Sequence, residues 1–142
     1  MRRLPDWQSR FERLLSAHRT DRFVYGSWDC CLFVCDAIEV MTGTDPAQAF
    51  RGSYATRAEA MAAVRAYTGT ASIRVLARKI TAEHGMELVP GLNARRGDLV
   101  MFRRPRSWSL GIVALNGFEA MALDAGGIVM KPIAEACFAW RV

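Results

Sequence analysis

The order of helical and strand-like patterns along the chain is the feature that most constrains its fold. Before Gly85, apolar residues recur at helical spacing, which predicts helices over residues 5–19, 29–41, 56–69 and 72–83. After Gly85, short apolar runs between turn residues predict strands over residues 99–102, 110–115, 119–123, 128–130 and 137–142. Helices followed by strands are typical of an α+β fold in which the helices pack on one face of an antiparallel sheet.

Length and composition favour a single domain spanning residues 1–142. The 142 residues are 51% hydrophobic and 23% charged, which is enough apolar surface for a core, and there is no repeat or linker. No run of about 18 apolar residues predicts a membrane span, so we expect no membrane partner. The N-terminus lacks the apolar stretch of a signal peptide, and we therefore expect the chain to be made in the cytoplasm.

One arginine-rich segment follows the helical part. The formal net charge of the chain is +5, and residues 95–106 contain five arginines and one aspartate. The arginines are Arg95, Arg96, Arg103, Arg104 and Arg106. Such a cluster suits phosphates or an acidic partner surface, while the alternative is two solvated strand ends. Because no nucleic-acid motif accompanies it, we expect no nucleic-acid partner.

Three of the four cysteines lie close together in the sequence. Cys30, Cys31 and Cys35 fall on one predicted helix and Cys137 lies near the C-terminus, a distribution that argues against a disulfide framework. Cys31 and Cys35 share a helix face and are expected in the core. We expect no metal and no cofactor; the alternative, a metal or iron–sulfur site, would require Cys137 to fold back onto the other three.

Cys30 has a sequence context that suits a reactive thiol. If Asp29 caps the predicted helix, Cys30 is its first residue, where unpaired N–H groups and the helix dipole stabilise a thiolate and lower the pKa of the thiol. The alternative is a cysteine that is simply buried.

The order of several short motifs resembles a known family. The chain contains Asp29-Cys30 at a helix start, then Gly97-Asp98-Leu99-Val100-Met101-Phe102, then Leu110-Gly111-Ile112-Val113. This order resembles the NlpC-type cysteine peptidases, which are papain-like enzymes that cut peptidoglycan stem peptides and read Asp-Cys-Ser-Gly-Leu-Val, Gly-Asp-Leu-Val-Phe-Phe and His-Val-Gly-Ile-Tyr. Residues 22–142 resemble small phage and prophage proteins related to that family and encoded among tail genes.

The resemblance implies a papain-like NlpC-type fold with Cys30 at the nucleophile position. Ser109 stands where the family has its catalytic histidine, and Glu119 is the polar candidate for the third, orienting residue. A serine hydroxyl cannot exchange a proton near neutral pH as an imidazole does. His18 and His84 are expected to have structural roles, so the chain is interpreted as a catalytically degenerate relative.

The aromatic residues near these motifs leave three interpretations open. Tyr25, Trp28 and Trp108 could form the wall of a former substrate groove, a surface that binds a partner protein, or part of the core.

These features lead to one functional prediction and two alternatives. We expect a structural component of a phage or prophage tail tip or baseplate, in the virion after assembly in the host cytoplasm. Its partners would be hub, distal tail or tip proteins, with several copies in a symmetric assembly. The alternatives are an active cysteine peptidase or amidase that degrades peptidoglycan during DNA entry, and a metal- or iron–sulfur-binding tail-tip protein.

Overall fold

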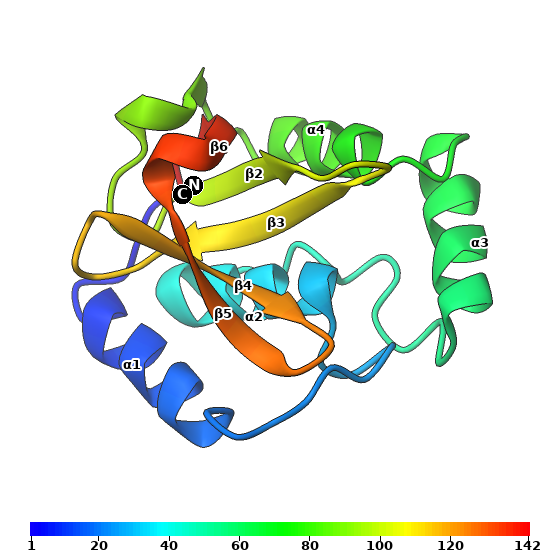
Figure 1. Cartoon of the computed structure of the whole chain (residues 1–142), viewed down its shortest axis with the longest axis horizontal. Coiled ribbons are helices and arrows are strands. Elements are labelled where there is room, and N and C mark those ends of the chain that lie inside the picture. Colours follow the sequence, from blue (N-terminus) through cyan, green and yellow to red (C-terminus); the bar gives the residue numbers. More distant parts are fainter.

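The computed structural model describes residues 1–142 as an α+β fold with four helices and a six-stranded antiparallel sheet (Figure 1). The helices are α1 (Trp7–Ala17), α2 (Cys30–Thr42), α3 (Arg57–Thr68) and α4 (Ile73–Glu83). The strands are β1 (Leu88–Pro90), β2 (Leu99–Arg103), β3 (Trp108–Val113), β4 (Glu119–Asp124), β5 (Gly127–Pro132) and β6 (Ala136–Trp140). Two short 3-10 helices, η1 (Gly91–Asn93) and η2 (Ile133–Glu135), complete the chain. The predicted α+β class is confirmed.

Three of the four predicted helices, α2, α3 and α4, begin directly after a residue whose side chain caps them. Thr56 and Ser72 accept backbone N–H groups in the first turns of α3 and α4. Gly43 and Gly69 end α2 and α3 in the left-handed conformation, with φ of 81° and 85°. None of the four helices combines the length and apolar character needed to cross a bilayer.

The sheet has the order β1-β6-β2-β3-β4-β5, so the last strand lies inside the sheet rather than at its edge. All of its strand pairs are antiparallel. The five predicted strands are present, and β1 is an additional edge strand that the sequence analysis does not predict.

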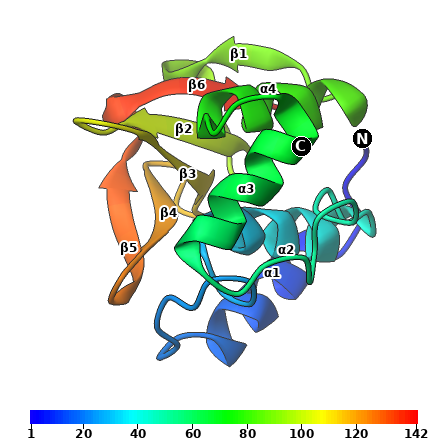
Figure 2. The ribbon, with the colours of Figure 1, turned by 90° about the vertical axis from the view of Figure 1, so that its right-hand side faces the viewer.

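Both faces of the sheet are buried. The face toward the helices carries Leu110 and Ile112 of β3, which belong to the main core together with the apolar residues of α2. The opposite face carries a smaller core around Val100, Phe102 and Val113. Figure 2 shows α3 and α4 in front of α2, with the sheet curving around them.

A buried carboxylate joins the two ends of the chain. Asp98 accepts hydrogen bonds from Arg3 near the N-terminus, at 2.6 Å, and from Arg141 near the C-terminus. It also accepts the backbone N–H of Arg95 at 2.8 Å, while its side chain is only 1% exposed. The termini accordingly lie close together (Figure 1).

Candidate functional site

Cys30 occupies the first position of α2, as the sequence predicts. The buried carboxylate of Asp29 caps the helix by accepting the N–H groups of Cys31 and Leu32 at 3.1 and 2.9 Å. Its second oxygen accepts the N–H of Gly26 at 3.0 Å and the hydroxyl of Tyr54 at 2.6 Å. These four bonds fix the helix start and the loop before it, and they hold the Cys30 sulfur in one place.

The environment of Cys30 lowers the pKa of its thiol below the ordinary value. The main cause is a hydrogen bond with the Cys31 sulfur, 4.0 Å away, and the backbone N–H groups of Cys30 and Cys31 act in the same direction. Burial and the nearby charge of Asp29 oppose this shift and raise the pKa. The pKa of Cys31 is raised well above its usual value by the same bond and by burial.

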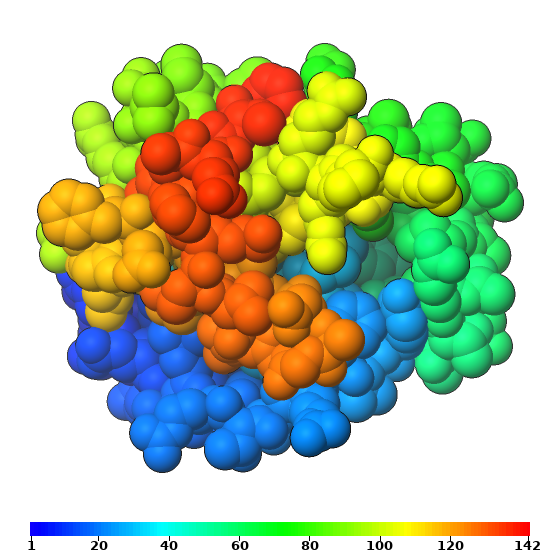
Figure 3. Space-filling view, viewed as in Figure 1, coloured from blue at the N-terminus to red at the C-terminus, as the bar shows by residue number.

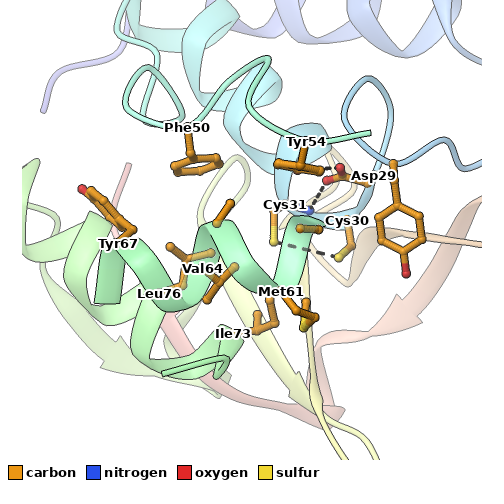
Figure 4. Close-up of a pocket in the computed structure, with 13 residues that line it drawn as sticks. Asp29, Cys30, Cys31, Phe50, Tyr54, Met61, Val64, Tyr67, Ile73 and Leu76 are labelled. Carbon is orange, nitrogen blue, oxygen red and sulfur yellow. Dashed lines mark hydrogen bonds between the residues drawn. The ribbon is translucent and has the colours of Figure 1, made fainter. Parts of the chain in front are cut away.

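A small apolar pocket lies beside the Cys30 sulfur, between α2, α3, α4 and the loop before α3 (Figure 4). We call it the Cys30 pocket. It is a cavity of about 40 Å³, and Asp29 is the one charged residue that lines it. The other lining residues are Tyr25, Cys30, Cys31, Phe50, Tyr54, Ala60, Met61, Ala63, Val64, Tyr67, Ile73 and Leu76.

A larger open groove of about 1150 Å³ begins at the same sulfur, and we call it the Cys30 groove. Figure 3 shows it as a hollow between the yellow segment around residues 103–108, the orange segment after β4 and the green helix α3. Its lining includes Phe23, Tyr25, Cys30, Arg57, Met61, Ile73, Arg103, Arg104, Arg106, Trp108, Leu123 and Asp124.

Arginines dominate the charge of the Cys30 groove. Arg103 ends β2, Arg104 and Arg106 lie in the exposed turn between β2 and β3, and Arg57 lies in the first turn of α3. None of the four forms an ion pair with an acidic residue of the chain. The guanidinium of Arg103 lies 5.8 Å from the centre of the Trp108 ring.

The other two arginines of the predicted cluster lie elsewhere. Arg95 and Arg96 precede β2, whereas Arg103 ends it, and the five residues of this strand span about 16 Å. The carbonyl of Arg96 accepts a hydrogen bond from Arg3, on the side of the chain termini. The five arginines therefore form two groups, one at each end of β2.

The three aromatic residues do not share one role. Tyr25 and Trp108 line the Cys30 groove, as one of the three interpretations predicts. Trp28 is 4% exposed and packs in the core, stacked on His18 at 4.0 Å and edge-on against Phe33. Trp28 is therefore a core residue and not a binding residue of the surface.

Ser109 is buried on the face of the sheet opposite to Cys30. It pairs with Phe102, which belongs to the smaller core on that face. A Cβ built on Gly111, two residues further along β3, would likewise come within 3.4 Å of the Phe102 ring. Because side chains alternate along a strand, the neighbours of Ser109 that face the helices are Trp108 and Leu110.

The other candidates for a catalytic dyad or triad do not meet at Cys30. Glu119 begins β4 and accepts a hydrogen bond from Asn116, whereas the groove borders the far end of that strand at Asp124. His18 Nδ1 lies 2.7 Å from Asp21 Oδ2. His84 follows α4 and donates from Nδ1 to the carbonyl of Ile80 at 2.9 Å. Both histidines have the structural contacts that their positions predict.

The structure does not bring the four cysteines together. Cys31 and Cys35 are buried in the core as predicted, and Cys137 is exposed on β6. No group of three or more cysteine, histidine or acidic side chains has the arrangement needed to hold a metal ion. The metal-binding alternative therefore lacks a ligand set.

Sequence reasoning did not identify two charged residues of the groove. Arg57 lies on α3, and Asp124 ends β4 just before the glycine-rich turn to β5. Both line the groove, which is formed by segments that are distant in the sequence. No local signal in the sequence marks either position.

A family model described as a domain of unknown function (DUF6950) matches residues 2–142, which is nearly the whole chain. No curated protein has a matching sequence.

Proposed function

The chain belongs to the DUF6950 family, and we propose that it is a structural component of a phage or prophage tail tip or baseplate. In this proposal it is a catalytically degenerate domain of the papain-like NlpC type that binds hub, distal tail or tip proteins. It joins the tail in several symmetric copies after assembly in the host cytoplasm.

The observation that carries this proposal is the isolation of the Cys30 thiol from any proton shuttle. The only side chain that hydrogen-bonds to its sulfur is that of Cys31, and the carboxylate of Asp29 is occupied by its four donors. A general base contributes about 10²–10⁴-fold to such reactions. The lack of a general base beside the thiol supports a loss of catalytic activity. The domain would then act by binding other proteins through its surface.

The charge of the Cys30 groove supports binding to an acidic partner. Arg103, Arg104 and Arg106 are exposed and form no ion pair within the chain. Arginine is also enriched among the residues that dominate protein–protein interfaces. A partner with carboxylates at the matching positions would neutralise these charges.

Incorporation into purified particles tests this proposal. The double variant Arg103→Glu and Arg104→Glu should be depleted from particles, as measured by immunoblotting against a tail marker. The variant Arg95→Glu and Arg96→Glu is the matched control, since it changes the net charge equally at the opposite end of β2. Normal incorporation of the first variant would show that the groove is not the docking face. Absence of the unmodified protein from particles would refute the structural role.

One observation favours the alternative function of a cysteine peptidase or amidase. The pKa of the Cys30 thiol is lowered, and the sulfur lies at the start of a helix and borders an open groove. A thiolate in this position would be nucleophilic without a histidine, although it would lack a proton donor for the leaving amine.

Cell-wall digestion separates the two functions. If the chain is a peptidase, purified protein should release fragments from isolated peptidoglycan, and Cys30→Ala should abolish this release without changing incorporation into particles. If it is a structural component, neither protein should release fragments detectable by chromatography.

A further inference from the structure

We propose that the Cys30 groove binds an extended acidic segment of a partner protein and that an aliphatic side chain of this segment enters the Cys30 pocket. This inference rests on the proposed function, to which it adds the chemical class of the ligand. The pocket then selects one side chain, while the groove recognises the charge around it.

The groove and the pocket form one continuous surface. Tyr25, Cys30, Met61 and Ile73 line both of them. A segment that lies in the groove therefore contacts residues that also line the pocket, with Cys30 among them. The thiol contributes a small, polarisable surface at the junction, with no bond formed or broken.

The charges around the groove are unfavourable without a ligand. Arg103, Arg104 and Arg106 lie within four consecutive residues and repel one another, and no acidic residue of the chain pairs with them. Arg57 is the first residue of α3, where the helix dipole also disfavours a cation. The chain itself supplies one acidic residue to the lining of the groove, Asp124. Carboxylates of a ligand would reduce both the repulsion between the arginines and the unfavourable position of Arg57.

The pocket accepts an apolar group of limited size. Two of the polar groups in its wall are already bonded, because the Tyr54 hydroxyl and the N–H of Cys31 both donate to Asp29. A water molecule inside would find few partners, which favours an apolar occupant. The volume of about 40 Å³ corresponds to about three heavy atoms, the end of a leucine or valine side chain rather than an aromatic ring.

The pocket also distinguishes a protein partner from another polyanion. A nucleic acid would satisfy the arginines but has no aliphatic side chain for the pocket. If the ligand is an acidic peptide segment, its binding affinity should therefore depend both on one apolar side chain of the peptide and on the arginines of the groove.

Fluorescence anisotropy with a labelled synthetic peptide tests the inference on the unmodified protein. The peptide carries a single leucine between runs of glutamates, and the comparison peptide has serine in place of the leucine. We expect the serine peptide to bind about tenfold to 50-fold more weakly, because it loses the burial of about three aliphatic carbons. Equal affinities would refute the role of the pocket. Tighter binding of a single-stranded oligonucleotide would refute the acidic segment as the ligand.

Two alanines of α3 provide a matched pair of protein variants. Ala63 lies in the wall of the Cys30 pocket, whereas Ala66 is exposed and does not line it. We expect Ala63→Leu to reduce the affinity for the leucine peptide to that of the serine peptide, and Ala66→Leu to leave both affinities unchanged. Arg103→Glu with Arg104→Glu should weaken both peptides at least about tenfold. Circular dichroism confirms that each variant is folded.

Particle incorporation distinguishes failure of this inference from failure of the proposed function. If Ala63→Leu is incorporated normally while the Arg103 and Arg104 double variant is not, docking through the groove stands and the pocket is not used. If both variants are incorporated normally, this inference is wrong and the groove is not the docking face, while the structural role stands. Absence of the unmodified protein from the particles would instead refute the structural role. Loss of both from the particles is the result that the inference predicts.

Discussion

Removal of the Asp29 carboxylate should destabilise the fold far more than removal of another helix-start aspartate. In Asp29→Ala, α2 loses its N-cap, which costs about 1 kcal/mol. The Tyr54 hydroxyl and the Gly26 N–H also lose their acceptor, at about 1 kcal/mol each. Because Asp29 is 2% exposed, water cannot replace it, and the expected loss is about 3 kcal/mol. This is a large fraction of the roughly 5–15 kcal/mol that stabilises a typical domain.

Urea unfolding followed by tryptophan fluorescence measures this loss as a decrease in the free energy of unfolding at unchanged slope. Asp6→Ala is the control, since Asp6 precedes α1 but its exposed side chain makes no capping hydrogen bond; it should behave like the unmodified protein. Tyr54→Phe removes a single donor to Asp29 and should cost about 1 kcal/mol. If Asp29→Ala were as stable as Asp6→Ala, the capping network would not hold the site in place.

Three further changes test other parts of the structure. Asp98→Asn should lower the free energy of unfolding by about 3 kcal/mol in the same urea assay, because it leaves two half-buried arginines without a counter-charge. Gly26→Ala should lower the melting temperature more than Gly52→Ala: both have positive φ, but only at Gly26 would a Cβ lie 2.0 Å from a backbone oxygen. Asp29→Asn should lower the pKa of Cys30 further, since the Asp29 charge raises it; the midpoint of iodoacetamide alkylation at Cys30, followed by peptide mass mapping, should then move to lower pH. An unchanged or higher midpoint would contradict this assignment of cause.

The elements with local signals are those that the sequence predicts well. Helix α3 is defined by Thr56 and Gly69, and helix α2 by Asp29 and Gly43, so their positions follow from capping chemistry alone. Strand β1 has no such signal. It is three residues long, ends in Pro90 and is largely exposed, and it exists because β6 pairs with it across a long stretch of chain.

The candidate site shows the same division between local and distant determinants. Cys30 follows directly from the cap before it, and the arginines after β2 follow from the end of an apolar run. The aromatic loop leaves open whether Trp28 lies at a surface or in the core, and the structure shows it buried between His18 and Phe33. Whether such a residue is exposed or buried depends on contacts between different elements of the fold, and the pattern of residues along the sequence does not reveal these contacts.

The orientation of β3 decides which of its residues can act on the thiol. A strand with one solvated face alternates between apolar and polar residues, and the alternation reveals which residues point inward. Residues 109–113 of β3 are all buried, because cores lie on both faces of the sheet, so this signal is missing. The proposed relationship to the NlpC type would put Ser109 at the histidine position, yet the side chains of β3 that face the helices are Trp108 and Leu110. An imidazole at position 109 of this strand would point into the core around Phe102. The face of β3 toward the helices carries Trp108 and Leu110, which are bulky and apolar, and therefore offers no proton acceptor to Cys30.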